Sequence, residues 1–507
     1  MMQHATTIEL VCPELPSSVT VIRLDGHEAL NELFDFELEF VHPAAEVDLD
    51  ACIRATTRSA LVFRVDHEIV RVIHGNLAEI CANVRAVAAG DDRPQRTIIG
   101  RFVPRFWGST LHSRTEVHVG SVTEIIGSLL ERCGLEETVD FEFRLSENYP
   151  SREFVLQYHE SDYDFLRRLC EHWGIAWSFE HGTRDRLVFS DHNAGMLDVA
   201  VWQAPQGSAS DADASSHLPE NPSADASHVT ELPFRQFGSN VEDAGAFVFS
   251  HTCQRRRGPA SIMVHDYNYR VPQVGLSASR PIHPDGEGRV IDHGLHLKLP
   301  EEAELLAKIR AELMLARRVR HRCSTYTALV RAGASFTLTP DPDGNDVALL
   351  VRRVEHRFEN VYTASFEAQP ADVTYRPELS TSKPRIAGYL TGTVRGDDPN
   401  VPNIDGDGRY QVLFDCDGKD GGESRAARPM RMLQAHAGAN YGMHFPLKPG
   451  TEVAVGFMNG DPDRPFIAGC LPNPLTPSPV RGERANVRRN VIQSHHGVQI
   501  ELDDGAA

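Results

Sequence analysis

The chain has 507 residues, of which 41% are hydrophobic and 24% are charged, and its formal net charge at pH 7 is −20. This length predicts two to four domains, and the composition argues against disorder of the whole chain. The negative charge argues against nonspecific binding to nucleic acid or to an anionic membrane.

The cysteines and the N-terminus indicate the compartment. Nine cysteines are spread along the chain without a CxxC pair, a pattern typical of reduced thiols in a cytoplasmic protein. The first sixteen residues contain no basic segment followed by an apolar run, and no stretch of about 18 apolar residues occurs. We therefore expect cytoplasmic synthesis without a signal peptide, so that any export uses a machine that needs none.

Residues 1 to about 200 are predicted to form strands with two short helices. Apolar residues at helical spacing predict helices from Ser121 to Cys133 and from Ser161 to Trp173. Each begins at a serine that can cap the helix and is followed directly by a glycine. The mixture of strands and helices indicates an α+β segment.

The middle of the chain alternates between polar and structured stretches. Residues 203–227 are rich in Ala, Ser, Asp and Pro and are predicted to form a flexible surface loop. The longest helix is predicted from Glu301 to His321, and strands are expected to resume from Thr325 to about Glu367. A linker punctuated by prolines follows at residues 370–384.

Residues 387–475 are predicted to form a small all-β barrel such as an OB-fold, because short alternating strands follow one another over about 90 residues. Its clearest element is the hairpin at residues 450–474, whose turn Asn459–Pro465 combines glycine, aspartate and proline. Two further strands are predicted at residues 490–494 and 497–502, after a proline-rich spacer.

Several blocks resemble VgrG proteins, the spike proteins of type VI secretion systems. The turn NGDPDRP at 459–465 is one block, and the QYHESD stretch at 157–162, followed by Phe165, is another. The early LFDF strand at 33–36 and the barrel stretch at 395–412 also match, in the same order along the chain. The resemblance therefore covers nearly the whole sequence.

The resemblance implies a mainly β fold with some α (α+β) in four parts. Residues 1–375 would form a phage-hub-like domain of paired β-barrels with inserted helices, and residues 376–386 a linker. Residues 387–475 would form the OB-fold barrel, and residues 476–507 a spacer and the start of a β-helical needle. The family implies a homotrimer that caps the Hcp tube hexamer, contacts baseplate proteins and carries a PAAR-type tip protein or an effector. On sheath contraction it would be exported by the type VI machine of a bacterium and would transiently cross a target membrane.

The residues singled out are predicted to have a structural role, with no catalytic, cofactor-binding or metal-binding residue among them. They are Asn459, Gly460, Asp461, Pro462, Asp463, Arg464, Pro465, Gln157, Tyr158, Glu160, Ser161, Asp162 and Phe165.

Enzymatic, metal-binding and nucleic-acid-binding alternatives find little support in the residues. His67-Glu68 resembles the start of a zinc-protease motif, but it lies in a predicted hairpin and the second histidine is out of phase. His495-His496 could place metal ligands at a trimer axis, although solvated turn histidines are the simpler interpretation. Residues 387–475 hold eight basic and eleven acidic side chains, which disfavours nucleic-acid binding. The remaining alternative of the same fold is the spike of a phage tail or of an extracellular contractile injection particle.

Overall fold

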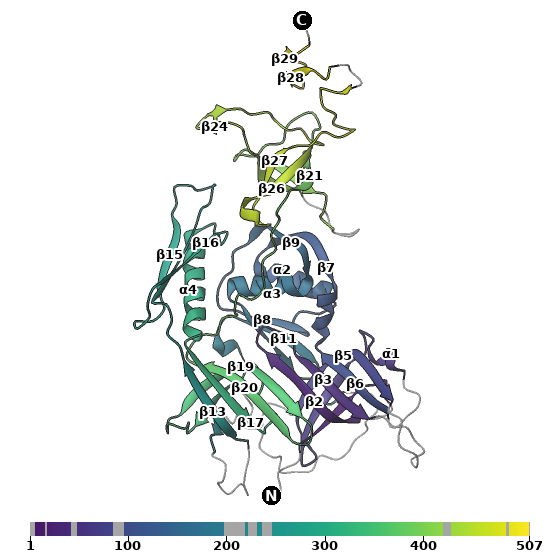
Figure 1. Ribbon diagram of the computed structural model, residues 1–507, viewed down its shortest axis with the longest axis vertical. Coiled ribbons are helices and arrows are strands. Elements are labelled where there is room, and N and C mark those ends of the chain that lie inside the picture. The colour runs from purple at the N-terminus through teal and green to yellow at the C-terminus, as the bar shows by residue number, and fades with distance from the viewer. Residues whose placement is uncertain are drawn as a thin grey trace. The chain divides into compact units, whose positions relative to one another are not determined.

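Strands dominate the fold, as the alternating sequence predicts, and a few helices are inserted between them (Figure 1). The computed structural model describes residues 6–15, 18–41, 48–84, 96–196, 218–221, 231–235, 246–418, 427–482 and 486–505. The chain divides into two compact units, each of which is treated by itself. Unit 1 comprises Met1–Ser113, Gly120–Ser151 and Ser161–Ser382, and unit 2 comprises Arg114–Val119, Arg152–Glu160 and Lys383–Ala507.

The first barrel of unit 1 contains six strands in the order β1-β4-β5-β6-β3-β2, closed by pairing between β1 and β2. Its core is aromatic, and each of its fully buried phenylalanines contributes about 2–3 kcal/mol through the area removed from water. The strands are β1 Thr6–Val11, β2 Val19–Ala29, β3 Asp35–Val41, β4 Ser59–Val65, β5 Glu68–Val84 and β6 Arg96–Val103.

The second barrel follows the order β13-β17-β20-β19-β18-β12, and a bridge between Phe234 and Val248 closes it. Strand β2 pairs with β19, so the two barrels share one continuous sheet. Paired barrels are therefore present, as predicted. The strands are β12 Glu231–Pro233, β13 Val248–Arg255, β17 Val319–Thr325, β18 Ser335–Thr339, β19 Val347–Phe358 and β20 Tyr362–Pro370.

A buried polar network joins the two barrels. Arg71 on β5 donates to both carboxylate oxygens of Glu28 on β2, at 2.7 and 2.8 Å. His356 on β19 lies 3.0 Å from the same carboxylate and 2.6 Å from the Tyr362 hydroxyl. Burial alone would raise the pKa of Glu28, but the charge of Arg71 and the hydrogen bond from His356 lower it to about 2. Removing one member of such a network leaves a buried charge without its partner, which costs about 3–5 kcal/mol.

Two of the predicted helices are confirmed. Helix α2, Val122–Arg132, begins with the capping box of Ser121, and α3, Asp162–Trp173, is capped by Ser161. Gly174 ends α3 in the left-handed conformation, with a φ of 67°. Apolar residues on one face of each helix are buried, which accounts for the helical spacing in the sequence.

The third helix is shorter than the predicted range from Glu301 to His321. Helix α4 spans Pro300–Ala316, and the chain then enters β17 at Val319, where it pairs with β13 and β20. Side chains from His321 onward alternate between buried and exposed positions, so the barrel overrides the helical continuation. The smaller elements of unit 1 are α1 Leu49–Cys52, η1 Arg105–Leu111, β8 Phe141–Arg144, β10 Ala176–His181, β11 Asp185–Ser190, η2 Asn193–Gly195, β14 Ser261–Asp266, β15 Leu276–Pro281 and β16 Arg289–His293.

Unit 2 is built on a five-stranded sheet in the order β23-β22-β21-β26-β27, as expected for a small barrel. Strands β7 Ser113–Gly120 and β9 Arg152–Ser161 pair with each other, and their middle residues belong to this unit. Two short hairpins complete it, β24-β25 and β28-β29. The bounds are β21 Leu390–Arg395, β22 Arg409–Phe414, β23 Arg428–Arg431, β24 Ala437–Gly438, β25 Tyr441–Gly442, β26 Glu452–Phe457, η3 Met458–Gly460, β27 Pro465–Cys470, β28 Arg489–Gln493 and β29 Gln499–Asp503.

Most of the predicted loop at 203–227 lies outside the described residues. Within it the structure describes Leu218–Asn221, where the Asn221 side chain bonds to the backbone of Val72 and His181. No helix of the described residues is long and apolar enough to cross a membrane.

Candidate functional site

The turn between β26 and β27 carries the motif Asn459–Pro465. Asn459 and Gly460 both adopt positive φ, at 57° and 72°, which reverses the chain within two residues. The backbone N–H of Asp463 donates to the side chain of Asp461 at 3.0 Å. The two unusual backbone conformations and the aspartate turn explain why this stretch contains Asn, Gly and Asp at these places.

Asp463 connects this turn to strand β9, which lies far from it in the sequence. Its Oδ1 accepts a hydrogen bond from the backbone N–H of Leu156 on β9, at 2.8 Å. Its Oδ2 lies 2.7 Å from the ammonium group of Lys383, which also contacts Asp461 Oδ1 at 2.5 Å. Asp463 is 9% exposed, so this carboxylate satisfies a buried backbone donor and a lysine at once.

The rest of the turn is fixed by the backbone and by its prolines. The carbonyl of Gly460 accepts a hydrogen bond from the N–H of Ile386 at 2.9 Å. Pro462 is buried, and Pro465 begins β27 opposite Phe457. The motif therefore forms a rigid corner of the unit 2 barrel.

The QYHES block ends strand β9 in unit 2. Gln157 is fully buried, and its side chain donates to the Glu160 carbonyl at 3.2 Å and lies 3.2 Å from the His118 ring nitrogen. The backbone N–H of Tyr158 donates to the Glu160 side chain at 3.4 Å. His159 has a positive φ of 47°, so these side-chain bonds stabilise a sharp bend in the backbone.

The following residues begin α3 in unit 1. The Ser161 hydroxyl accepts the backbone N–H of Asp164 at 3.0 Å. Asp162 and Phe165 are buried, at 1% and 0% exposure. The block thus ends one element and starts the next, which requires this order of polar and apolar residues.

Sequence reasoning missed the partners of these motifs. Asp463 and Leu156 are 307 positions apart, so nothing local indicated their contact. Lys383 lies in the predicted linker, yet it contacts both aspartates of the turn. The only sequence signal for this contact was the lysine itself, which stands alone among serines, threonines and prolines near the end of the predicted linker.

The described residues show no constellation that points to catalysis. No group of three or more His, Cys, Asp or Glu side chains in the described part of the chain could hold a metal ion. His67 and Glu68 lie where β4 turns into β5, and His495 and His496 are exposed in the turn between β28 and β29.

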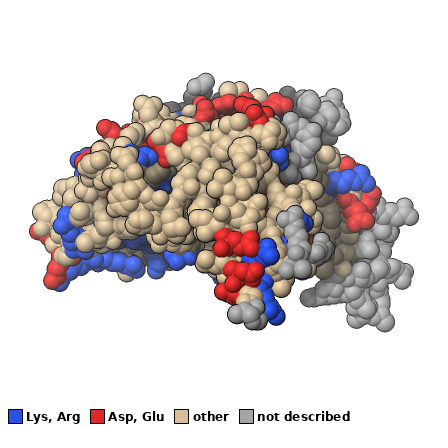
Figure 2. All heavy atoms as spheres, turned by 90° about the horizontal axis from the view of Figure 1, so that it is seen from above, with Lys and Arg blue, Asp and Glu red and all other residues tan. Residues whose placement is uncertain are grey.

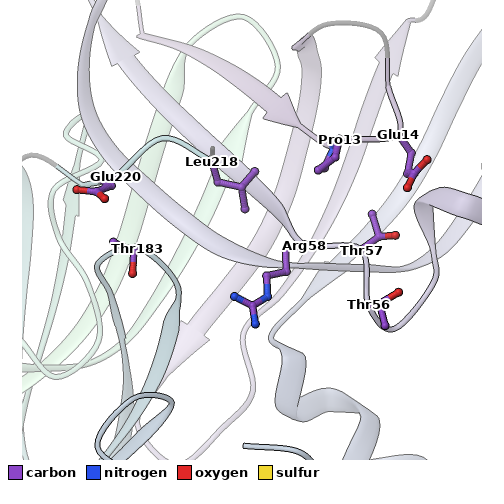
Figure 3. A pocket seen from close by; sticks show the side chains of 8 residues that line it. All are labelled: Pro13, Glu14, Thr56, Thr57, Arg58, Thr183, Leu218 and Glu220. Carbon is purple, nitrogen blue, oxygen red and sulfur yellow. The ribbon is translucent and has the colours of Figure 1, made fainter. Parts of the chain in front are cut away.

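A pocket of about 460 Å³ lies in unit 1 (Figure 3), away in sequence from both motifs. Arg58 projects among threonine side chains, and two glutamates lie at the periphery of the close-up. Its lining offers no nucleophile beside a base. The residues that line it are Pro13, Glu14, Thr56, Thr57, Arg58, Thr183, Leu218 and Glu220.

Two family models match separate parts of the chain. Residues 27–362 match the phage tail baseplate hub (GPD) family, and residues 401–471 match the type VI secretion system/phage-baseplate injector OB domain. The first range runs from the end of β2 to the start of β20, and the second contains β22 to β27 of unit 2.

Curated relatives align over nearly the whole chain. The type VI secretion system spike proteins VgrG4b and VgrG1c of Pseudomonas aeruginosa are 26% and 27% identical, over 97% and 93% of this chain. The chain spans 59% and 62% of their lengths. The actin cross-linking toxin VgrG1 of Vibrio cholerae is 26% identical over 81% of this chain, which spans 36% of that protein.

Solved structures share the fold. The E. coli c3393 protein, described as a type VI secretion component similar to the T4 tail proteins gp27 and gp5, gives a TM-score of 0.63 at 20% identity. That match covers 91% of this chain and 99% of the other. The Francisella PdpA–VgrG complex gives a TM-score of 0.59 at 9% identity, over 99% of this chain and 76% of the other. With its hub match over residues 27–362 and its OB-domain match, the chain belongs to the phage tail baseplate hub (GPD) family and is of the VgrG type.

Proposed function

We propose that this protein is the homotrimeric hub and spike base of a type VI secretion system. The observation that carries the proposal is that one chain contains both paired hub barrels and an injector OB barrel. In addition, 97% of this chain aligns with a type VI spike protein. In this role the hub caps the Hcp tube and meets the baseplate. The far end of the spike carries a PAAR-type tip protein or an effector.

The work of such a protein is mechanical, and the fold suits it. Contraction of the sheath would load the hub in compression, and the sheet that joins both barrels distributes this load over many cooperative strand pairs. The network of Glu28, Arg71 and His356 holds the barrels together at their joint. In unit 2 the corner at Asp463 anchors β9 to the OB barrel, which supports a structural role for the family motif.

The hairpin β28-β29 supports association of several copies. Ile492 and Ile500 are directly paired and are 49% and 62% exposed, and Val498 and Leu502 are exposed as well. An isolated two-stranded hairpin with this much exposed apolar surface is barely stable in water. The same hairpin from two further copies would cover it, as at the base of a three-chain needle.

The chief alternative is the spike of a phage tail or of an extracellular contractile injection particle, because the hub fold is common to all of these. The partner tube distinguishes them. Nucleic-acid binding and hydrolysis are less well supported, since the OB segment is acidic and no group of three or more His, Cys, Asp or Glu side chains in the described residues could hold a metal ion.

Tube binding tests the proposal. The purified chain is mixed with the Hcp protein of the same genome and, in parallel, with the tube protein of a prophage of that genome, and complexes are separated by size. Binding to Hcp alone, at three chains per Hcp hexamer, is the expected result. Binding to the phage tube protein alone would favour the alternative, and binding to neither would contradict a role as a tube cap.

Secretion gives a second readout in cells. Export of the chain into the medium should require an intact contractile sheath, and deleting the sheath gene should abolish it. Export that persists without the sheath would show that another machine carries the protein.

A further inference from the structure

The pocket of unit 1 is walled by separate stretches of the chain. They are the end of β1, the approach to β4, the turn between β10 and β11, and the short segment at residues 218–221. Its volume of about 460 Å³ lies within the range of small-molecule sites, about 300–1,000 Å³. The pocket is therefore large enough to hold a small ligand.

Hydrogen bonds fix the wall that residues 218–221 form. The Asn221 side chain accepts from the backbone N–H of Val72 and donates to the carbonyl of the same residue, both at 2.7 Å. A residue of a neighbouring strand would exchange the same two bonds. The ring nitrogen Nε2 of His74 lies 3.0 Å from the carbonyl oxygen of Pro219. This wall is therefore in place before a ligand arrives, so that binding does not have to order it.

Arg58 carries a positive charge in this lining that nothing balances directly. It forms no hydrogen bond or ion pair within the described residues. Its neighbours Arg105 and Arg184 both pair with Asp140, at 2.7 and 3.2 Å. Arg105 also pairs with Asp185, at 2.5 Å. Burial and repulsion from Arg105 and Arg184 lower the pKa of Arg58, so an anionic group bound beside it would be stabilising.

Two threonine hydroxyls add hydrogen-bond donors next to Arg58. In Figure 3 Arg58 projects between Thr183 on one side and Thr56 on the other. In the part of the chain that the structure describes, neither hydroxyl has a hydrogen-bond partner. Arginine offers two parallel N–H groups to a carboxylate, and each hydroxyl can donate one further bond. The centre of the pocket thus suits a carboxylate.

Glu14 and Glu220 restrict the kind of anion that fits. Their side chains lie at opposite ends of the lining in Figure 3, and neither forms an ion pair among the described residues. One arginine and two glutamates leave the lining with a formal charge of −1. A doubly charged anion would be repelled by the glutamates, whereas cationic groups attached to a carboxylate would be attracted to them.

The charge of the whole chain acts in the same direction. The formal net charge is −20, and in Figure 2 acidic side chains form several separate groups on the face that is drawn. A simple anion is therefore repelled at long range. A ligand that carries its own cationic groups is not repelled in this way.

We propose that this pocket binds a small ligand in which one carboxylate is accompanied by cationic groups, the chemistry of a free basic amino acid. The carboxylate lies against Arg58 and the two threonine hydroxyls, and the cationic groups face Glu14 and Glu220. Such a ligand is singly positive and balances the charge of the lining. The site is additional to the proposed spike function, which does not require it.

Compounds that share one carbon chain test the class of ligand. L-lysine carries both kinds of charge, L-norleucine lacks the side-chain ammonium group, and pentane-1,5-diamine lacks the carboxylate. Binding of each to the full chain is measured by ligand-observed NMR titration, and inorganic phosphate is titrated in parallel. Lysine should bind about tenfold more tightly than each of the others. Equal binding of norleucine, the diamine or phosphate would show that the class is wrong, and no detectable binding of lysine would overturn the site itself.

Substitutions locate the binding in the pocket. Arg58→Ala removes a side chain without a partner in the described residues, so the fold should persist by circular dichroism while lysine binding weakens about tenfold. Glu220→Gln should weaken lysine binding and strengthen phosphate binding, a reversal that a merely structural role would not produce.

The matched control is Arg54→Ala. This exposed arginine lies in the same connection between α1 and β4, does not line the pocket, and is 3.6 Å from Asp48. Its removal should leave lysine binding unchanged. Equal losses in the Arg54→Ala and Arg58→Ala proteins would overturn the assignment of the site, and would leave the spike function unaffected.

Discussion

Replacing Asp463 by alanine should destabilise unit 2 selectively. The substitution removes the hydrogen bond that the buried backbone N–H of Leu156 donates to Asp463, which costs about 2–3 kcal/mol. Lys383 keeps its contact with Asp461, and it is partly exposed, so the loss of its second carboxylate adds less than about 1 kcal/mol. Asp463→Asn retains an oxygen for the Leu156 N–H and should lose no more than about 1 kcal/mol.

Urea unfolding followed by two signals measures this effect. No tryptophan occurs in the ranges of unit 2, so tryptophan fluorescence reports on unit 1 while far-ultraviolet circular dichroism reports on both. With a slope of about 1–2 kcal/mol per M, the alanine variant should shift the dichroism transition of unit 2 down by about 1–3 M. The fluorescence midpoint should stay unchanged, and the Leu156 amide should exchange its hydrogen faster than in the unsubstituted protein.

The control is Asp407→Ala, which removes a half-exposed aspartate from another turn of the same unit and breaks one ion pair to Arg409, at 3.3 Å. It should change stability by less than about 0.5 kcal/mol. Equal midpoints and equal Leu156 protection in the Asp463→Ala and Asp407→Ala proteins would refute the reasoning that the family motif anchors β9.

Three further predictions concern pH, backbone conformation and association. Burial lowers the pKa of His356 from 6.5 and so keeps this side chain neutral. Arg71 and His356 lower the pKa of Glu28 from 4.5 to about 2. In acid the unfolded chain therefore binds more protons than the folded chain, so the stability of unit 1, measured by fluorescence, should fall as the pH drops below 6.5. It should fall by about 3 kcal/mol more between pH 4.5 and 2, where Glu28 is protonated first in the unfolded chain. A Glu28→Gln protein that still shows this second fall would contradict the assignment. Gly460→Ala places a side chain at a φ of 72° and should cost about 1–2 kcal/mol in urea unfolding, whereas Gly469→Ala, at an ordinary φ with open space beside it, should cost almost nothing. Deleting residues 486–505 removes the exposed apolar hairpin and should raise the concentration at which oligomers dissociate; an unchanged dilution curve would show that the hairpin contributes nothing to association.

The sequence predicted those elements whose signals are local. The serine caps at Ser121 and Ser161 and the apolar spacing between 121 and 173 gave both helices to within a residue or two. The turn at 459–465 was evident because its glycine, aspartates and prolines each match a backbone requirement. Where a distant strand decides the structure, local signals failed, as at residues 317–321, where pairing with β13 and β20 ends the helix.

Contacts between distant parts of the chain could not be predicted from the sequence. The bond between Asp463 and Leu156 and the position of Lys383 depend on strand order, which composition and periodicity do not encode. The resemblance to VgrG proteins supplied the paired barrels, because the motifs recur in the same order. It did not reveal that β9 helps to build unit 2.

Mass in solution tests the central claim most directly. Light scattering on a size-exclusion column, over a dilution series of the full chain, should give three times the 56.3 kDa mass of one chain at high concentration. A chain that remains a monomer at the highest concentration would contradict the account of a trimeric hub and spike base.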